Sequence, residues 1–185
     1  MRKIFLTPLL VALAALAASP LQAAKLVTDP DRPRALPDEG PVAVEWTDPA
    51  GFSEIRLSHN RWESERGDWV TELASYLRKR AAARLPDGQR MDVVITDIER
   101  AGDFEPGRSL NSDHIRVMRD IYPPRMTLQV RITDASGQVV SEGEHKLVDH
   151  SYMMNSRPME TDPLQYEKRM IDNWLRKELP GSGDS

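Results

Sequence analysis

The 185-residue chain has no cysteine, so neither a disulfide nor a lipid-modified cysteine can hold or anchor it. It also lacks the G-x-S-x-G turn of serine hydrolases, the G-x-G-x-x-G turn of dinucleotide-binding folds, a phosphate loop and the H-E-x-x-H motif. We therefore predict no cofactor and assign no catalytic residue. Core packing alone must stabilise the fold.

Neither a nucleic-acid partner nor a stable membrane span is indicated. The formal net charge is -4, and no basic patch interleaved with aromatic residues appears. The longest apolar run, residues 4–18, is too short to cross a bilayer comfortably, and it ends in Ser-Pro rather than in a charged stop.

The first residues have the three parts of a secretory signal: Arg2-Lys3, an apolar run, and the small-residue exit Leu21-Gln22-Ala23. We interpret residues 1–23 as a cleaved signal peptide and the mature protein as periplasmic. The Pro-rich, charged residues 24–41 are expected to be a linker, residues 42–179 a single domain, and residues 180–185 a disordered tail.

The clearest structural signal is a hairpin over residues 125–147. Its first limb alternates apolar and polar residues, as a strand with one buried face requires, and residues 134–137 (Asp-Ala-Ser-Gly) supply a turn. Pairing Ile132 with Val140 would bury three charged residues of the return limb, whereas pairing Ile132 with Val139 turns them to solvent. We therefore expect Ile132 opposite Val139.

Two long helices are predicted from apolar arcs on the helical wheel. The first covers residues 60–85 and begins at Asn60, with Glu63 completing a capping box. Gly67 weakens its first turn, so a start nearer Asp68 is the alternative. The second covers residues 163–179.

Strands are predicted at residues 42–47 and 91–98, besides the hairpin. The order of elements favours an α+β fold, with a mostly antiparallel sheet of about four strands and two long helices packed on one of its faces, that is, a two-layer sandwich.

The loop over residues 149–162 is unusually apolar. Its side chains either tuck under the domain as a satellite cluster or form a contact surface. Four of its residues are our candidate binding residues: Tyr152, Met153, Met154 and Arg157.

Glu167 is the fifth candidate, because it lies near the centre of the apolar arc of the second helix. A carboxylate there must be paired, hydrogen-bonded or reached by water, because an ionised group left alone would protonate instead. The first helix carries Arg66, Arg80 and Arg84 within its own apolar arc, so we expect one of them within ion-pair distance of Glu167. Such a pair is more often structural than catalytic.

A metal site has little support. The histidines are His59, His114, His145 and His150. His145 and His150 flank Asp149, but strand alternation sends His145 to the core face, and no paired-ligand spacing exists. No metal ligand is assigned.

Four segments carry a family resemblance: VEWTDPAGFSEIR (44–56), LPDGQRMDVVITDIERAGDFEP (85–106), IRVMRDIYPPRMTLQVRI (115–132) and MMNSRPMETDPLQYEKRMIDNWL (153–175). With DIYPPR and YEKRMIDNW as its most specific motifs, the chain resembles the bacterial domain-of-unknown-function family 3016. The resemblance covers nearly all of residues 42–179. It implies a small exported single-domain protein, and it brings no activity, cofactor or site residue.

These observations favour a non-enzymatic periplasmic module that binds an envelope protein or a cell-wall or lipid component. The alternative is a hydrolase of envelope material acting through carboxylates; the candidates are Asp97, Glu99, Asp103 and Glu167. A deep pocket with two convergent carboxylates of shifted pKa would favour the hydrolase, and a shallow apolar patch around residues 152–154 would favour the binder. Metal handling is a second alternative.

Export makes a direct prediction about the mature N-terminus. Mass spectrometry of the exported protein should find a chain that begins at Ala24 or Lys25, because the small-residue exit sets the cleavage point. A mature protein that still carries Met1 would contradict this interpretation.

Overall fold

A computed structural model describes residues 25–107, 113–154 and 161–179. Its main sheet has four strands in the order β1-β2-β5-β6: β1 (Val42–Trp46), β2 (Arg90–Glu99), β5 (Arg125–Thr133) and β6 (Val139–Val148). β1 and β2 are parallel, and the helices between them form the crossover connection that a parallel pair requires. The other neighbouring strands are antiparallel. The predicted α+β class is confirmed, with a sheet that is mixed through this one parallel pair.

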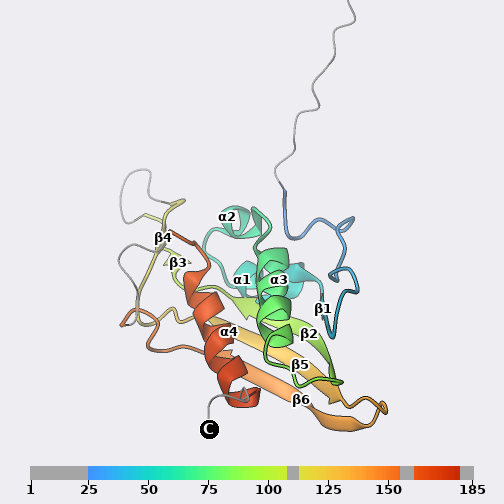
Figure 1. The fold of residues 1–185 in the computed structure, drawn as a ribbon. Helices are drawn as coiled ribbons and strands as arrows, with labels where there is room; N and C mark the ends of the chain where they lie inside the picture. The colour runs from blue at the N-terminus through green and yellow to red at the C-terminus, as the bar shows by residue number, and fades with distance from the viewer. Residues whose placement is uncertain (1–24, 108–112, 155–160, 180–185) are drawn as a thin grey trace, which may run out of the picture.

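The helices fall into two groups along the chain. Between β1 and β2 lie a 3-10 turn, η1 (Pro49–Gly51), and the helices α1 (Ser53–Arg56), α2 (Arg61–Glu65) and α3 (Trp69–Ala82); α4 (Gln165–Glu178) follows the hairpin. Figure 1 shows α3 and α4 side by side in front of the sheet.

The helix predicted over residues 60–85 is broken into α2 and α3. Gly67 has a φ of +96°, a conformation that a residue with a side chain rarely adopts, so the chain leaves the helix there and resumes it at Trp69. The predicted cap is present at α2, where the Asn60 side chain accepts a hydrogen bond from the backbone N–H of Glu63 at 3.2 Å.

The core lies on one face of the sheet. Alternate residues of the two central strands are buried, namely Met91, Val93 and Ile95 of β2 and Met126, Leu128, Val130 and Ile132 of β5. The same core contains Leu73 and Leu77 of α3 and Ile171 and Leu175 of α4. The period of two in the strands and the apolar arcs of the helices therefore meet in one apolar layer.

The hairpin has the predicted faces, but its predicted register is wrong. Ile132 lies opposite Ser141, and Val139 lies opposite Thr133, with an irregularity between Ile132 and Thr133. The turn was predicted over residues 134–137, but it extends to Gln138, whose carbonyl accepts a hydrogen bond from the backbone N–H of Asp134. A shift of two residues leaves every side chain on the same face, so the charge argument selected the face without determining the register.

Residues 25–36, which we call the N-terminal arm, pack against the domain although they were expected to belong to a linker. Leu36 N–H donates to Val44 O at 3.0 Å, and Trp46 N–H donates to Arg34 O at 2.8 Å, so the arm covers the outer edge of β1. The Val27 side chain is part of the core. The packed unit therefore begins before residue 42.

A second, two-stranded sheet caps one end of the molecule. Its strands are β3 (Asp103–Phe104) and β4 (Arg116–Val117). This small sheet, α1, α2 and residues 149–154 lie at the same end of the main sheet, the end that contains the last residues of β2 and β6 and the first residues of β5. We call this region the loop end. The hairpin turn lies at the opposite end (Figure 1).

Candidate functional site

A buried carboxylate organises the loop end. Glu54 of α1 is 4% exposed, and its Oε1 accepts hydrogen bonds from Arg100 Nη2, at 2.8 Å, and from Arg116 Nη2. Its Oε2 accepts a third hydrogen bond from the backbone N–H of Arg100 at 2.9 Å. Arg100 follows β2 and Arg116 lies on β4, so one carboxylate joins three segments. We call Glu54, Arg100 and Arg116 the ion cluster.

Aromatic rings line the ion cluster. The guanidinium of Arg100 lies 4.6 Å from the ring centroid of Trp69, and that of Arg116 lies 4.7 Å from the ring centroid of Phe104. Arg116 also donates to the carbonyl of Gly102 at 2.8 Å. Burial lowers the pKa of Arg100, although Glu54 opposes this shift. A carboxylate, backbone carbonyls and aromatic ring faces therefore surround the two guanidinium groups.

Glu167 is buried as the wheel predicts, and it bonds to the loop end. It is 1% exposed, and its Oε1 accepts a hydrogen bond from the backbone N–H of Ala101 at 2.7 Å. Its Oε2 has no hydrogen-bond partner among the described residues. Burial raises the pKa of Glu167, while the Ala101 hydrogen bond and the positive charge of Arg100 act against the shift.

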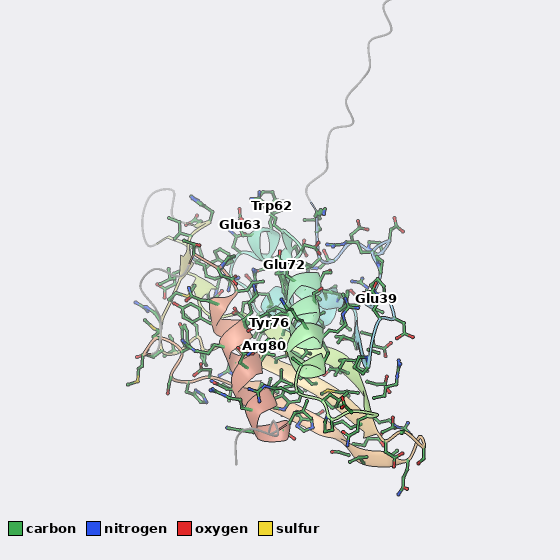
Figure 2. All side chains as sticks on the ribbon, in the orientation of Figure 1. Glu39, Trp62, Glu63, Glu72, Tyr76 and Arg80 are labelled. Carbon is green, nitrogen blue, oxygen red and sulfur yellow. The ribbon has the colours of Figure 1, made fainter. Side chains whose placement is uncertain are left out.

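The predicted ion pair between Glu167 and an arginine of the first helix is wrong. Arg66 pairs with Glu63, Arg80 pairs with Asp172, and Arg84 donates to the carbonyl of Leu179. Because α3 and α4 pack side by side, Arg80 meets the flank of α4, whereas Glu167 points to the backbone after β2. Tyr76 shares Asp172 with Arg80, and burial together with this carboxylate raises the pKa of Tyr76 to about 12. Tyr76 and Arg80 lie close together in Figure 2.

The candidate residues of the apolar loop divide between interior and surface. Tyr152 is buried; its hydroxyl donates to the carbonyl of Arg119 at 2.8 Å, and its ring meets that of Tyr166 edge-on with the centroids 4.9 Å apart. Met153 is partly exposed and Met154 is 85% exposed. Arg157 lies outside the described residues. Tyr152 therefore anchors the loop, and the two methionines face solvent.

Large exposed apolar side chains lie along β6 and on the short segments of the loop end. Of the described residues, nine are of this kind. Three belong to β6, and the other six belong to the loop end and form what we call the apolar rim: Leu57, Trp62, Ile115, Ile121, Met153 and Met154. Figure 2 shows Trp62 projecting outward from α2.

Side-chain to backbone hydrogen bonds hold the segments of the apolar rim together. Asn60 Nδ2 donates to the carbonyl of Asp113 at 2.9 Å, which places α2 beside the segment that carries Ile115. The bond from Tyr152 to Arg119 places the methionines beside the segment that carries Ile121. Residues distant in sequence are thus brought to one end of the fold.

In the pockets formed by the described residues, the carboxylates of the hydrolase alternative are not brought together in a deep cavity. Asp97 accepts hydrogen bonds from the backbone N–H of Ser53, at 2.6 Å, and from its hydroxyl, at 2.8 Å, at the start of α1. Glu99 and Asp103 line a pocket of about 30 Å³, which has room for little more than water. Substrate pockets are usually about ten times larger.

Those two carboxylates also have basic partners. Glu99 lies 2.9 Å from Arg125 Nη1, and Asp103 lies 2.6 Å from Nδ1 of the exposed His59. Over residues 25–107, 113–154 and 161–179, no group of three or more His, Asp or Glu side chains is placed to hold a metal ion.

Comparison with known proteins gives a match to a protein-family model. A family model described as "Protein of unknown function (DUF3016)" matches residues 40–177. No curated protein and no solved structure matches. In the described parts of the chain, no helix is long and apolar enough to cross a membrane.

We expect the fold to lose much of its stability when the carboxylate of the ion cluster is removed. Glu54→Gln should lower the free energy of unfolding by about 3–5 kcal/mol, because it leaves two largely buried guanidinium groups without a counter-charge. Glu99→Gln is the matched control: it removes one pair in which Glu99 is 28% and Arg125 46% exposed, and it should cost about 0–1 kcal/mol. Denaturant unfolding measures both, and equal losses would contradict the assignment.

Glu167 predicts a pH dependence. Its ordinary pKa is 4.5, and burial raises the folded-state value. Between those two values the folded state binds more protons than the unfolded state, so the contribution of Glu167 to stability is greatest below about pH 4.5 and is lost as the pH rises.

The comparison for Glu167 is with Glu167→Gln, which keeps an acceptor for Ala101 N–H but cannot ionise. Unfolding between about pH 4 and 8 should show the variant gaining stability relative to the natural protein as the pH rises. A stability difference that stays constant over this range would show that Glu167 is not shifted.

Proposed function

The chain belongs to the DUF3016 family, whose description assigns no function, and we propose that it is an exported, non-enzymatic module that binds another component of the cell envelope through the apolar rim. The observation that carries this proposal is the gathering of six exposed large apolar side chains at the loop end. Export rests on the basic, apolar and small-residue start of the sequence.

The apolar rim has the properties of a recognition surface. Apolar side chains scattered singly over a surface need no explanation, but a group of them on one region marks a site of interaction. The segments that carry the rim are held by the ion cluster, by Asn60 and by Tyr152. A surface ordered before binding loses less conformational entropy when a partner docks.

The charges around the rim favour a protein partner over an anionic lipid surface. Several arginines of the loop end already have carboxylate partners: Arg61 with Glu65, Arg66 with Glu63, and Arg119 with Glu105. Binding to anionic lipid relies on an excess of unpaired basic residues, and the chain as a whole has a net charge of -4. We therefore take an envelope protein with an apolar surface as the partner.

The test places charge on the rim. Capture from envelope extracts should recover a partner with the natural chain, and Trp62→Glu/Met154→Glu should weaken binding of that identified partner at least about tenfold, since it buries two charges at the contact. The control Ala135→Glu/Gln138→Glu adds the same charge at the exposed hairpin turn, at the opposite end of the molecule, and should bind normally.

The same three proteins, the natural chain, the rim variant and the control variant, test the other kinds of partner. Co-sedimentation with vesicles of phosphatidylethanolamine and phosphatidylglycerol tests lipid, and co-sedimentation with purified peptidoglycan tests the cell wall. Rim-dependent binding to either of these in place of a protein would overturn the choice of partner. Unchanged binding by a rim variant that unfolds at the normal temperature would overturn the rim as the binding surface.

A further inference from the structure

The two edges of the main sheet differ in what covers them. The outer edge of β1 is hydrogen-bonded to the N-terminal arm through Leu36 and Arg34. The ten-residue strand β6 forms the other edge, and within the part of the chain that the structure describes no backbone segment pairs with its outer side. An edge strand of this length offers a row of unpaired backbone donors and acceptors to a further strand.

Charged side chains often protect such an edge from pairing, and β6 has three of them. Every second residue of β6 lies on the solvent face of the sheet, and these residues are Val140, Glu142, Glu144, Lys146 and Val148. The two valines are 55% and 43% exposed. When this series is set antiparallel to itself with Glu144 at the centre, valine meets valine and glutamate meets lysine. The charges therefore permit one pairing rather than preventing all of them.

We propose that β6 pairs with β6 of a second copy of this chain, antiparallel and about a two-fold axis at Glu144, to form one continuous eight-stranded sheet. Each Glu142 then lies opposite Lys146 of the second copy, and each Val140 lies opposite Val148. Opposite charges and apolar residues directly across an antiparallel pair stabilise it.

Neighbouring registers are less favourable. A two-residue shift one way sets Glu142 against Glu144, a pair of like charges. A shift the other way sets Glu144 against Lys146, so it keeps an ion pair, but it sets Glu142 against Val148 and leaves Val140 without an apolar partner. Two Glu144 side chains meet at the axis. The charge of each is partly offset by Lys146 Nζ of its own chain at 3.1 Å, and each accepts a hydrogen bond from Gln129 Nε2 at 3.1 Å.

The helix layer takes part in this arrangement. α4 lies over β6 on the other face of the sheet, where Trp174 Nε1–H donates to His145 Nδ1 at 3.3 Å, so the two copies of α4 approach each other beside the axis. The two-fold axis directs the two loop ends away from each other, and the dimer presents two apolar rims. The proposal is independent of what binds the rims.

The first test uses two full-length variants. In the proposed dimer Glu142 and Lys146 form two pairs between the copies. Lys146→Glu makes both of these pairs acidic, and Glu142→Lys makes both basic. Each variant alone should therefore dimerise at least about tenfold more weakly than the natural chain in sedimentation velocity. A mixture of the two restores both ion pairs and should form a heterodimer. A natural chain that is monomeric at all concentrations, single variants that dimerise normally, or a mixture that stays monomeric would overturn the proposal.

The second test does not depend on the stability of the charge variants, of which Glu142→Lys faces Arg131 within its own hairpin. The chain has no cysteine, so Glu144→Cys places a single thiol at the axis. Directly opposite Cα atoms in an antiparallel pair lie about 4.5–5.5 Å apart, within the range that a disulfide spans.

Mild oxidation should therefore join Glu144→Cys chains into covalent dimers. Glu142→Cys, on the same face but opposite Lys146 of the second copy, is the matched control and should cross-link at least about tenfold more slowly, because its thiols lie on opposite sides of the axis and beyond disulfide reach. Equal rates for the two variants would place the interface elsewhere and overturn the register.

Discussion

The contact between Glu54 and two arginines is the constraint on which the loop end depends. Glu54 lies on a four-residue helix, Arg100 follows the central strand β2, and Arg116 lies on the two-residue strand β4. Elements this short cannot hold their own position, since a helix or hairpin of a few residues is unstable in isolation. The buried carboxylate supplies the fixed point for all three.

Apolar packing therefore stabilises the main sheet with its long helices, whereas buried charges stabilise the loop end. The sheet and the long helices share a continuous apolar core, which is non-directional and tolerates small adjustments. The loop end relies on buried charges, whose geometry is directional and whose separation from a partner is costly. Glu167 links the two parts, because it projects from α4 and bonds to the backbone N–H of Ala101. This difference suits a recognition surface, which needs short, varied segments on a rigid support.

Local periodicity was enough to predict much of the sheet and of the helices. The alternation in residues 125–132 predicted which face of β5 is buried, and the wheel placed Glu167 within the apolar arc, where it is buried. Both inferences depend only on the repeat of a strand or a helix. The hairpin register was missed because the turn after Thr133 is wider than its four-residue signature. The split of the first helix was foreseen as a weakness at Gly67 with an alternative start near Asp68, which is the N-cap of α3.

The sequence by itself determined the class of the fold, the faces of its strands and helices, and the absence of disulfide chemistry, because each of these follows from residue type or from spacing along a few turns. The partners of the buried charges were decided only by the tertiary structure. Glu54 is separated from Arg100 by 46 residues and from Arg116 by 62, and no local pattern distinguishes these arginines from Arg66, Arg80 and Arg84. Which of several like charges meets a given carboxylate depends on how the elements pack in space, because a hydrogen bond forms only within a narrow range of distance and angle.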